Sequence, residues 1–175
     1  MTPWDLSPSN PLLYIDTSMN FSIIDHNVHS LPAHFKDMVC NKEFMVADII
    51  CLSETWLTSQ EHHDLDISGY NMHSSVLQGR VNGVAVYVKQ KYLYSVHSIT
   101  AANCSSLLIV INIRPSFLIL LLYRPPAITS TEFSDILCTI LQKIQHFAAD
   151  YKIILGDLNH NHATKSTISQ LQTYQ

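Results

Sequence analysis

The sequence predicts an α+β fold, with helices packed on the outside of one or two sheets of mostly antiparallel strands. Three observations predict it: a strand–helix–strand order near the start, a series of short β-branched and aromatic runs in the middle, and one amphipathic helix followed by a strand near the end. The chain has 175 residues, of which 47% are hydrophobic and 14% charged. That length suits one domain, and that composition is sufficient for a substantial buried core.

In the first part of the chain, the sequence predicts an irregular N-terminal segment, then a strand, a helix and a second strand. Residues 1–20 contain prolines and serines without periodicity, so the folded domain is placed at 21–175. Residues 21–27 begin apolar and turn polar, as a strand does when it ends at a functional edge. Apolar residues at helical spacing predict a short helix over 32–44, and an apolar run predicts a buried strand over 48–53.

The middle of the chain predicts five strands after a polar loop at 57–69. The five runs read YNMHSSV, GVAVYVK, YLYSVHSI, SLLIVINI and SFLILLLY, and they lie between positions 70 and 123. Asn-Gly, Lys-Gln-Lys and Arg-Pro sequences separate them. The Asn-Gly pair predicts a tight hairpin turn over 81–84.

The last part of the chain contains the most regular helical pattern. Thr129 and Glu132 have the spacing of a capping box, which marks a helix start. A strand over 152–155 and a Gly-Asp-Leu-Asn turn follow the helix, and 166–172 predicts the start of another helix. The apolar face of the main helix consists of Phe133, Ile136, Leu137, Ile140, Leu141, Ile144 and Phe147.

The net charge of −4 argues against a protein that coats DNA through a basic surface, because such affinity comes mainly from Lys and Arg. A nucleic-acid enzyme can keep this charge if a divalent cation offsets the carboxylates of its cleft. The longest apolar run, 117–123, is far shorter than the roughly 20 residues that span a bilayer. The N-terminus also lacks a signal-peptide pattern. We therefore expect a soluble intracellular protein that is not secreted and has no membrane partner.

The four cysteines are far apart in the sequence and show no paired spacing of the kind that binds metals. We expect buried free thiols in a reducing compartment, and no disulfide framework. These residues are Cys40, Cys51, Cys104 and Cys138.

Several predicted strands end in a polar or aromatic-polar residue. If these ends meet at one rim of the sheets, they form an oxygen-rich cluster of the kind that suits Mg²⁺, which takes one or two carboxylates plus water and phosphate oxygens. A cation there can polarise a phosphodiester, and neutral Asn and Tyr side chains can orient the phosphate or the attacking water. The five candidate residues are Asn27, Glu54, Tyr123, Asp157 and Asn159.

Each candidate residue alone also has an ordinary structural explanation. Gly-Asp-x-Asn after a strand is a common turn, because Asp and Asn bond their own backbone there. Glu54 alone fits a solvated strand end, and Tyr123 alone fits an aromatic residue packed by the prolines that follow it. Only the joint pattern predicts an active centre.

Five motifs occur in the order, and at roughly the separations, of one known family. The sequence resembles the endonuclease domain of non-LTR (LINE-type) retrotransposons. That domain belongs to the endonuclease/exonuclease/phosphatase superfamily, and the resemblance covers about 21–175. The motifs are NVHSL (27–31), ADIICLSETWL (47–57), GVAVYVK (83–89), LLLYRPP (120–126) and IILGDLN (153–159).

The resemblance implies a four-layered α/β sandwich, with two mainly antiparallel sheets flanked by helices, and Mg²⁺-dependent nicking of DNA. Mn²⁺ is the implied substitute metal, DNA the implied partner and the nucleus the implied location. Glu54 would be the metal ligand and Asn27 would help to position the metal or phosphate. Tyr123 would contact the scissile phosphate. Asp157 would orient or help to activate the attacking water, and Asn159 would stabilise the transition state.

The sequence departs from the family pattern in three places. The family chain continues past Gly-Asp-x-Asn to a Ser-Asp-His motif that supplies an acid–base histidine, and no Ser-Asp-His occurs here. The resemblance therefore implies a domain that is incomplete at its C-terminus. His160 and His162 lie too close to Asn159 in sequence to replace that histidine, and their His-x-His spacing is only a weak zinc signal. Asn82-Gly83 replaces the family's Gly-Gly, and His29 stands where a basic residue is usual.

Three hypotheses about function follow, and the sequence leaves the enzymatic status open. The leading one is a truncated DNA-nicking endonuclease that is weak or inactive, because positioned acid–base catalysis is typically worth 10²–10⁴-fold in rate. The second is a non-catalytic remnant or a module that binds nucleic acid or protein. The third is a phosphatase acting on a small phosphate ester. Target DNA and oligomeric state are not predicted, because loops choose the target within such folds.

Overall fold

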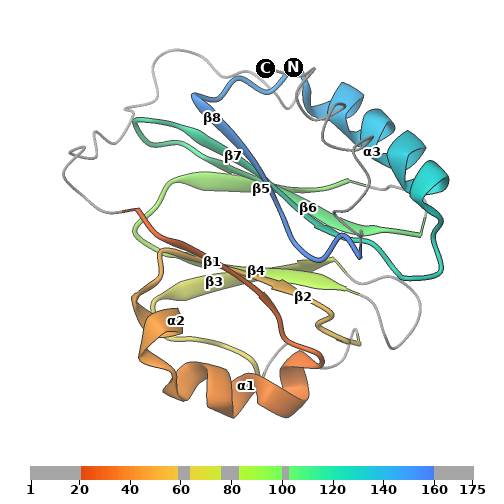
Figure 1. Cartoon of the computed structure of the whole chain (residues 1–175). Helices are drawn as coiled ribbons and strands as arrows, with labels where there is room; N and C mark the ends of the chain where they lie inside the picture. The colour runs from red at the N-terminus through yellow and green to blue at the C-terminus, as the bar shows by residue number, and fades with distance from the viewer. Residues whose placement is uncertain (1–20, 59–63, 76–82, 100–102, 160–175) are drawn as a thin grey trace.

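The computed structural model describes residues 21–58, 64–75, 83–99 and 103–159. Two helices, two four-stranded sheets and a third helix form four successive layers, as Figure 1 shows. The four-layered α+β sandwich is therefore confirmed. The irregular segment expected at the N-terminus and the helix start expected near the C-terminus both lie outside the described residues.

The first sheet has the strand order β1-β2-β4-β3. Its strands are β1 (Ile23–Asn27), β2 (Ile49–Ser53), β3 (Tyr70–Ser75) and β4 (Val84–Lys89). β1 and β2 are parallel because two helices connect them, and the remaining pairs are antiparallel. This arrangement leaves β1 at one edge of the sheet.

The second sheet has the order β5-β6-β7-β8. Its strands are β5 (Tyr94–Ser98), β6 (Ser105–Ile111), β7 (Phe117–Tyr123) and β8 (Tyr151–Leu155). β7 and β8 are parallel because a helix connects them, whereas the other pairs are antiparallel. β8 is therefore an edge strand, as β1 is in the first sheet.

Two helices, and not the single one expected over 32–44, cover the first sheet. α1 (Leu31–Cys40) and α2 (Lys42–Val46) are separated at Asn41. Asn41 has an extended backbone, and its side chain accepts a hydrogen bond from the Glu43 amide at 2.9 Å. An asparagine that caps the second helix in this way ends the first one, because the cap residue leaves the helical conformation.

α3 (Ser130–Ile144) covers the second sheet and confirms the predicted capping box. The Thr129 side chain accepts from the Glu132 amide, and the Glu132 carboxylate accepts from the Thr129 amide at 2.9 Å. The helix buries its apolar face against the sheet. Its buried residues are Phe133, Leu137, Ile140 and Ile144.

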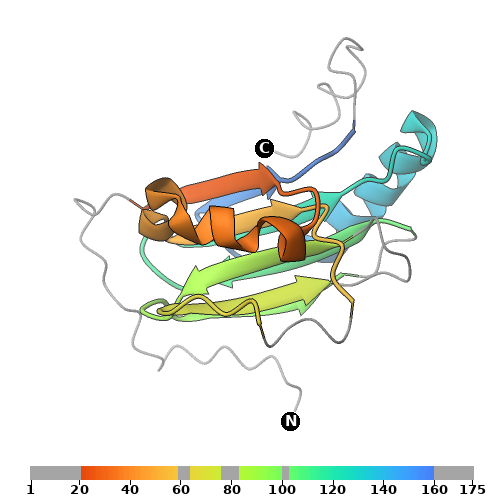
Figure 2. The ribbon, with the colours of Figure 1, turned by 90° about the horizontal axis from the view of Figure 1, so that it is seen from below.

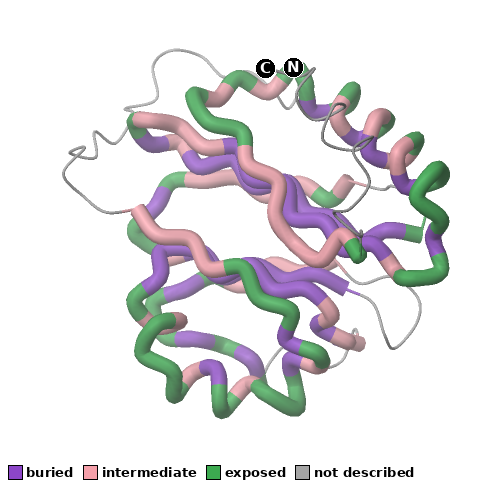
Figure 3. The backbone as a smooth tube through the Cα atoms, in the orientation of Figure 1, coloured by how far each residue is buried: buried purple, intermediate pink, exposed green. Residues whose placement is uncertain are grey.

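Three apolar clusters hold the layers together, and the central one lies between the two sheets. Strands β2 and β4 contribute to it from the first sheet, and β6 and β7 from the second. The outer clusters lie under α1 and α2 and under α3. Figure 3 shows the buried stretches concentrated on the inner strands, while β1 and β8 are half-buried or exposed. The edge strands are thus where polar side chains can be placed.

Two smaller expectations need correction. β3 and β4 pair from Ser75 opposite Val84, so their connection is longer than the tight turn expected over 81–84. Cys40 is exposed at the end of α1 and is not a buried thiol, whereas Cys51 and Cys104 are buried. All four cysteines are free.

In the part of the chain that the structure describes, no helix combines the length and the apolar character needed to cross a membrane.

A buried carboxylate fixes the entry to β2. Asp48 is 4% exposed, and its carboxylate accepts a hydrogen bond from the Ser22 amide at 3.0 Å. It also forms ion pairs with Lys91 Nζ at 2.9 Å and with Lys89 Nζ at 3.3 Å. Burial alone would raise the pKa of the Asp48 carboxyl, but the hydrogen bonds from Lys91 and Ser22 outweigh it and lower the pKa to about 2.

We expect Asp48 to stabilise the fold in a pH-dependent way. Its folded pKa lies below the value of about 3.9 for a free aspartate, so the stabilisation is full above that pH and is lost as the pH falls towards 2. At pH 7 it contributes about 2 kcal/mol. Urea unfolding should show a difference in the free energy of unfolding between wild type and Asp48→Asn that narrows by roughly 1–2 kcal/mol between pH 5 and pH 2. A constant gap, or the same behaviour in the exposed control Asp135→Asn, would contradict this role.

Candidate active site

The candidate site lies where the edge strands of the two sheets come together. Asp25 and Asn27 are two residues apart on β1 and therefore share one face of the strand. Asp25 Oδ2 accepts a hydrogen bond from the Gly156 amide at 3.0 Å, and Asn27 Nδ2 donates to Asp157 Oδ2 at 2.8 Å. These bonds join segments about 130 residues apart and connect the first sheet to the second, at the β1 and β8 edges seen in Figure 1.

Gly156 allows the chain to pass close to the neighbouring strand before it reaches Asp157. Its φ is +113°, which side chains rarely adopt, and an added Cβ would lie 2.1 Å from the Leu122 carbonyl oxygen. Beyond the glycine, the Asp157 carbonyl accepts from the Arg124 amide at 2.9 Å. The glycine of the Gly-Asp-x-Asn turn is therefore required by β7 and not only by the turn itself.

Glu54 follows β2 directly and is held by its backbone. Its φ is +51°, and its carbonyl accepts from the Ser30 amide at 2.8 Å, while the next carbonyl, that of Thr55, accepts from Leu31 at 2.9 Å. Its side chain is 15% exposed, and Oε2 lies 2.8 Å from His29 Nδ1. The loops after β1 and β2 thus form one paired unit that presents the Glu54 carboxylate.

Tyr123 ends β7 and is 3% exposed. Burial, the nearby negative charges of Glu54 and Asp157 and a hydrogen bond with Glu54 together raise the pKa of its hydroxyl to about 12. The hydroxyl is therefore protonated at neutral pH. It is a neutral hydrogen-bond donor beside both carboxylates.

Asn159 is brought to the site through Asp157. Its amide donates to Asp157 Oδ1 at 2.9 Å, and its Nδ2 donates to the Arg124 carbonyl at 2.8 Å. Its φ is +43°, a value that asparagine tolerates better than most residues. The Asn159 side chain has two N–H donors, and the hydrogen bond to the Arg124 carbonyl uses one of them. All five candidate residues are accordingly linked in one cluster.

Left-handed backbone conformations concentrate around this cluster. Among the residues that the structure describes, five non-glycine residues have positive φ, and all lie in the loops that follow β1, β2 and β8. Such conformations cost of order 1–3 kcal/mol each and persist where the surrounding structure fixes them, often at functional sites. They are His29, Ser30, Glu54, Trp56 and Asn159.

Sequence reasoning missed residues that position the cluster. Arg124 is 5% exposed, and its guanidinium donates to the carbonyls of Ile128, Leu158 and Asn159, so it holds the loop after β8. Nothing in the sequence indicates that role. Asp25 is different, because its spacing of two from Asn27 in a strand places both on one face. That spacing was a usable signal.

The donor set fits a divalent cation that keeps much of its water. Both Asp157 oxygens accept hydrogen bonds, from Asn27 and from the Asn159 amide. Glu54 contacts the exposed His29 ring and the Tyr123 hydroxyl, and it is the carboxylate to which the family resemblance assigns the metal. Within the described ranges no group of three or more His, Cys, Asp or Glu is placed to surround an ion. One carboxylate completed by water and phosphate oxygens suits Mg²⁺ or Mn²⁺, whereas a closed zinc site needs four protein ligands.

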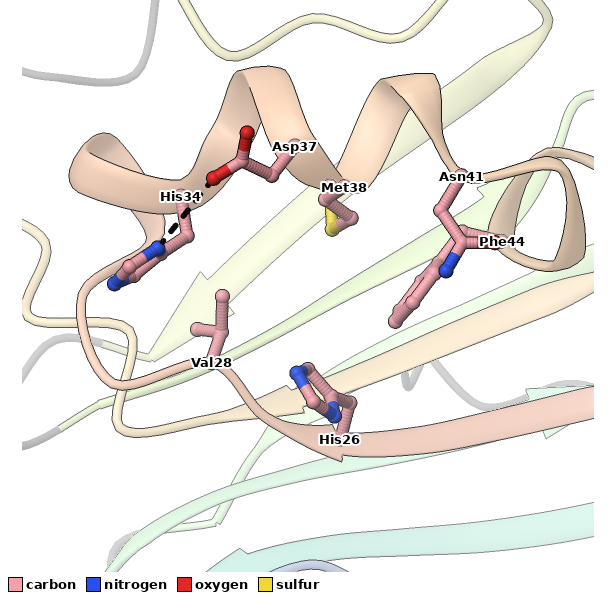
Figure 4. A pocket seen from close by; sticks show the side chains of 7 residues that line it. All are labelled: His26, Val28, His34, Asp37, Met38, Asn41 and Phe44. Carbon is pink, nitrogen blue, oxygen red and sulfur yellow. Dashed lines mark ion pairs between the residues drawn. The ribbon is translucent and has the colours of Figure 1, made fainter.

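A separate pocket of about 350 Å³ lies on the other side of β1, under α1 and α2 (Figure 4). His26 on β1 and Val28 just after it line the pocket. By strand alternation their side chains point to the opposite face from that of Asn27. Phe44 packs edge-on against His26, and His34 pairs with Asp37 at the rim, at 3.8 Å. The pocket therefore does not share side chains with the candidate site.

The sequence matches the endonuclease/exonuclease/phosphatase family over residues 25–170, which include all five candidate residues. The chain belongs to this family. Comparison of the sequence with curated proteins finds no significant match.

Several solved structures share the fold at low sequence identity. D. rerio TDP2, solved with a single-strand DNA product, superposes with a TM-score of 0.64 at 18% identity, covering 85% of this chain and 64% of that one. The human Nocturnin catalytic domain, solved with a bound sulfate anion, gives 0.60 at 16% identity, covering 85% and 67%. The 3′ phosphatase NExo from Neisseria, bound to a product DNA hairpin, gives 0.59 at 19% identity, covering 80% and 58%. The chain thus spans less than two thirds of the D. rerio TDP2 chain.

We expect Gly156→Ala to disrupt the site far more than Gly69→Ala. Both glycines have positive φ, so both substitutions carry a backbone strain of roughly 1–2 kcal/mol. Only position 156 adds a clash with the Leu122 backbone, since nothing lies within 4 Å of a Cβ at Gly69. Urea unfolding should show that the free energy of unfolding falls by at least about 3 kcal/mol in Gly156→Ala and by about 1 kcal/mol in Gly69→Ala. Equal losses would mean that the close approach to β7 is not rigid.

Proposed function

We propose that this chain carries the metal-binding and phosphate-binding groups of a divalent-metal-dependent DNA endonuclease of the non-LTR retrotransposon type. The observation that carries the proposal is the joining of two sheets at the site, through the bond between Asn27 and Asp157, with Glu54 and Tyr123 beside it. Family membership supports hydrolysis of phosphate esters as the reaction class.

DNA is the substrate class that best fits the similar structures and the motifs together. D. rerio TDP2 was solved with a single-strand DNA product and the Neisseria 3′ phosphatase with a product DNA hairpin. The retroelement branch is favoured by the ETWL sequence at 54–57 and the YRPP sequence at 123–126. A small phosphate ester would need only the metal site, and would not use those two motifs.

Each residue has a distinct part in the proposed reaction. Glu54 would hold the cation, which when bound polarises the scissile phosphate and offsets charge on the leaving oxygen. Tyr123 stays protonated and donates a hydrogen bond to a phosphate oxygen. Asp157, oriented by Asn27 and by the Asn159 amide, accepts a hydrogen bond from the attacking water. The second N–H of the Asn159 side chain would donate to the charge that develops on the phosphate.

These residues bind and orient but include no acid for the leaving oxygen. No Ser-Asp-His sequence occurs in the 175 residues. Because positioned acid–base catalysis is typically worth 10²–10⁴-fold, we expect the 175-residue chain to bind DNA with a divalent cation and to nick it slowly or not at all.

The test measures DNA binding and nicking of supercoiled plasmid by the folded, monodisperse 175-residue protein, in Mg²⁺ and in EDTA. We expect metal-dependent binding that is reduced at least about tenfold in Glu54→Gln, because the cation loses its protein carboxylate. Any nicking should be lost in Glu54→Gln and in Asp157→Asn. The matched controls are Glu43→Gln on α2 and Asp135→Asn on α3, which make the same changes at exposed positions away from the site.

The outcomes separate the three hypotheses. Mg²⁺-dependent nicking at an ordinary rate, lost in both site variants, would show that these groups suffice and that the acid–base histidine is dispensable. Metal-dependent binding without nicking would support the endonuclease site in a non-catalytic form. Binding and nicking that are equal in Mg²⁺ and EDTA, or unchanged in Glu54→Gln, would contradict the proposal. Hydrolysis of a phosphate monoester in place of plasmid would favour the phosphatase.

A further inference from the structure

His29, which pairs with Glu54, has no part in the reaction described above. His29 Nδ1 lies 2.8 Å from Glu54 Oε2, although the two residues are 25 positions apart and follow different strands. The His29 side chain is 70% exposed and the Glu54 side chain 15%. The imidazole is therefore much more open to solvent than the carboxylate to which a cation would bind.

The His29 ring is held in this direction by its neighbours. Its backbone amide donates to Asn27 Oδ1 at 3.2 Å, which fixes the turn after β1. Its ring packs against the Trp56 ring, with centroids 4.4 Å apart and planes inclined at 58°. The paired loops after β1 and β2 keep the two backbones together. The turn after β1, the Trp56 ring and the paired loops thus all favour the direction of the nitrogen towards the Glu54 oxygen.

The spacing of the two atoms is close to that of neighbouring ligands on one metal ion. Metal–nitrogen and metal–oxygen distances of roughly 2.0–2.2 Å place adjacent ligands of an octahedral ion about 3.0 Å apart. The observed separation of 2.8 Å between Nδ1 and Oε2 needs to widen by only a few tenths of an ångström. A cation that binds Glu54 through Oε2, in place of the hydrogen atom between the two side chains, has the His29 nitrogen as its neighbouring ligand.

We propose that His29 Nδ1 and Glu54 Oε2 together form a mixed nitrogen–oxygen metal site that selects Mn²⁺ over Mg²⁺. This inference rests on the proposed function, since Glu54 is its metal ligand. The other two carboxylates of the site accept hydrogen bonds from protein N–H groups, Asp157 from Asn27 and from the Asn159 amide and Asp25 from the Gly156 amide. Water and phosphate oxygens fill the remaining positions.

The selectivity follows from the chemistry of the imidazole. Mg²⁺ strongly prefers oxygen ligands and gives up water reluctantly, whereas first-row transition ions accept imidazole nitrogen. A site with Glu54 alone would suit either ion. The added nitrogen of His29 favours Mn²⁺ because it contributes affinity that Mg²⁺ cannot use to the same extent.

The test titrates the folded protein with Mn²⁺ alone, without DNA, at pH 8. Electron paramagnetic resonance follows free Mn²⁺, and Mg²⁺ is added in competition. We expect His29→Asn to weaken Mn²⁺ binding at least about tenfold and Mg²⁺ binding much less. Asparagine suits the φ of +47° at this position, and His29→Gln is the second variant should the first fail to fold. Electron spin echo modulation should show ¹⁴N coupling in the wild type that is absent from both variants.

Three control variants assign the result. Glu54→Gln should abolish Mn²⁺ binding, and His34→Ala on α1 should not affect it. The double variant His160→Ala with His162→Ala removes a His-x-His pair outside the described residues, and it should not affect Mn²⁺ binding either. Binding that depends on Glu54 but shows no ¹⁴N coupling, or is unchanged or stronger in His29→Asn, overturns the role of His29 and leaves the metal site intact. Binding that is lost only with His160 and His162 also overturns it. Absence of Glu54-dependent binding contradicts the proposed function itself.

Discussion

The contact between the two edge strands is the constraint on which the rest of the site depends. Each sheet is held to its own helices by a separate apolar cluster, and a third cluster joins the sheets through their inner strands. That apolar packing is not directional enough to align two strand ends. The hydrogen bonds from Gly156 to Asp25 and from Asn27 to Asp157 fix how the ends of β1 and β8 meet. Figure 2 gives a second view of these layers from below.

The site's chemistry is a consequence of that alignment. Asn27 and Glu54 lie on or directly after strands of the first sheet, and Tyr123 and Asp157 on or after strands of the second. Neither sheet alone therefore supplies both the proposed metal ligand and the residue proposed to orient the attacking water. Asp25 is close enough to the site that burial and the Asp157 charge raise its pKa, while the hydrogen bond from Gly156 lowers it. A bound cation would balance a cluster of negative charge assembled in this way, so the net charge of −4 is compatible with the proposed action on DNA.

Much of the fold could be predicted from the sequence because its signals are local. The capping box at Thr129, the apolar face of α3 and the alternation of the strands all depend on residues a few positions apart. The candidate residues were found because strands change character where they end. Two contacts were not predicted: the one between His29 and Glu54, and the hydrogen bonds from Arg124 to the loop after β8. Both depend on left-handed turns and on the meeting of distant segments. The helix break at Asn41 was missed because apolar spacing continues across it.

A double-mutant cycle on Asn27 and Asp157 tests most directly whether one site is built across the two sheets. Free energies of unfolding would be measured in urea for Asn27→Ala, Asp157→Ala and the double variant. The hydrogen bond of 2.8 Å between the two side chains predicts a coupling energy of about 1 kcal/mol, because each single change removes the same contact. Additive effects, within about 0.3 kcal/mol, would show that the side chains do not interact in solution and would contradict the joined site.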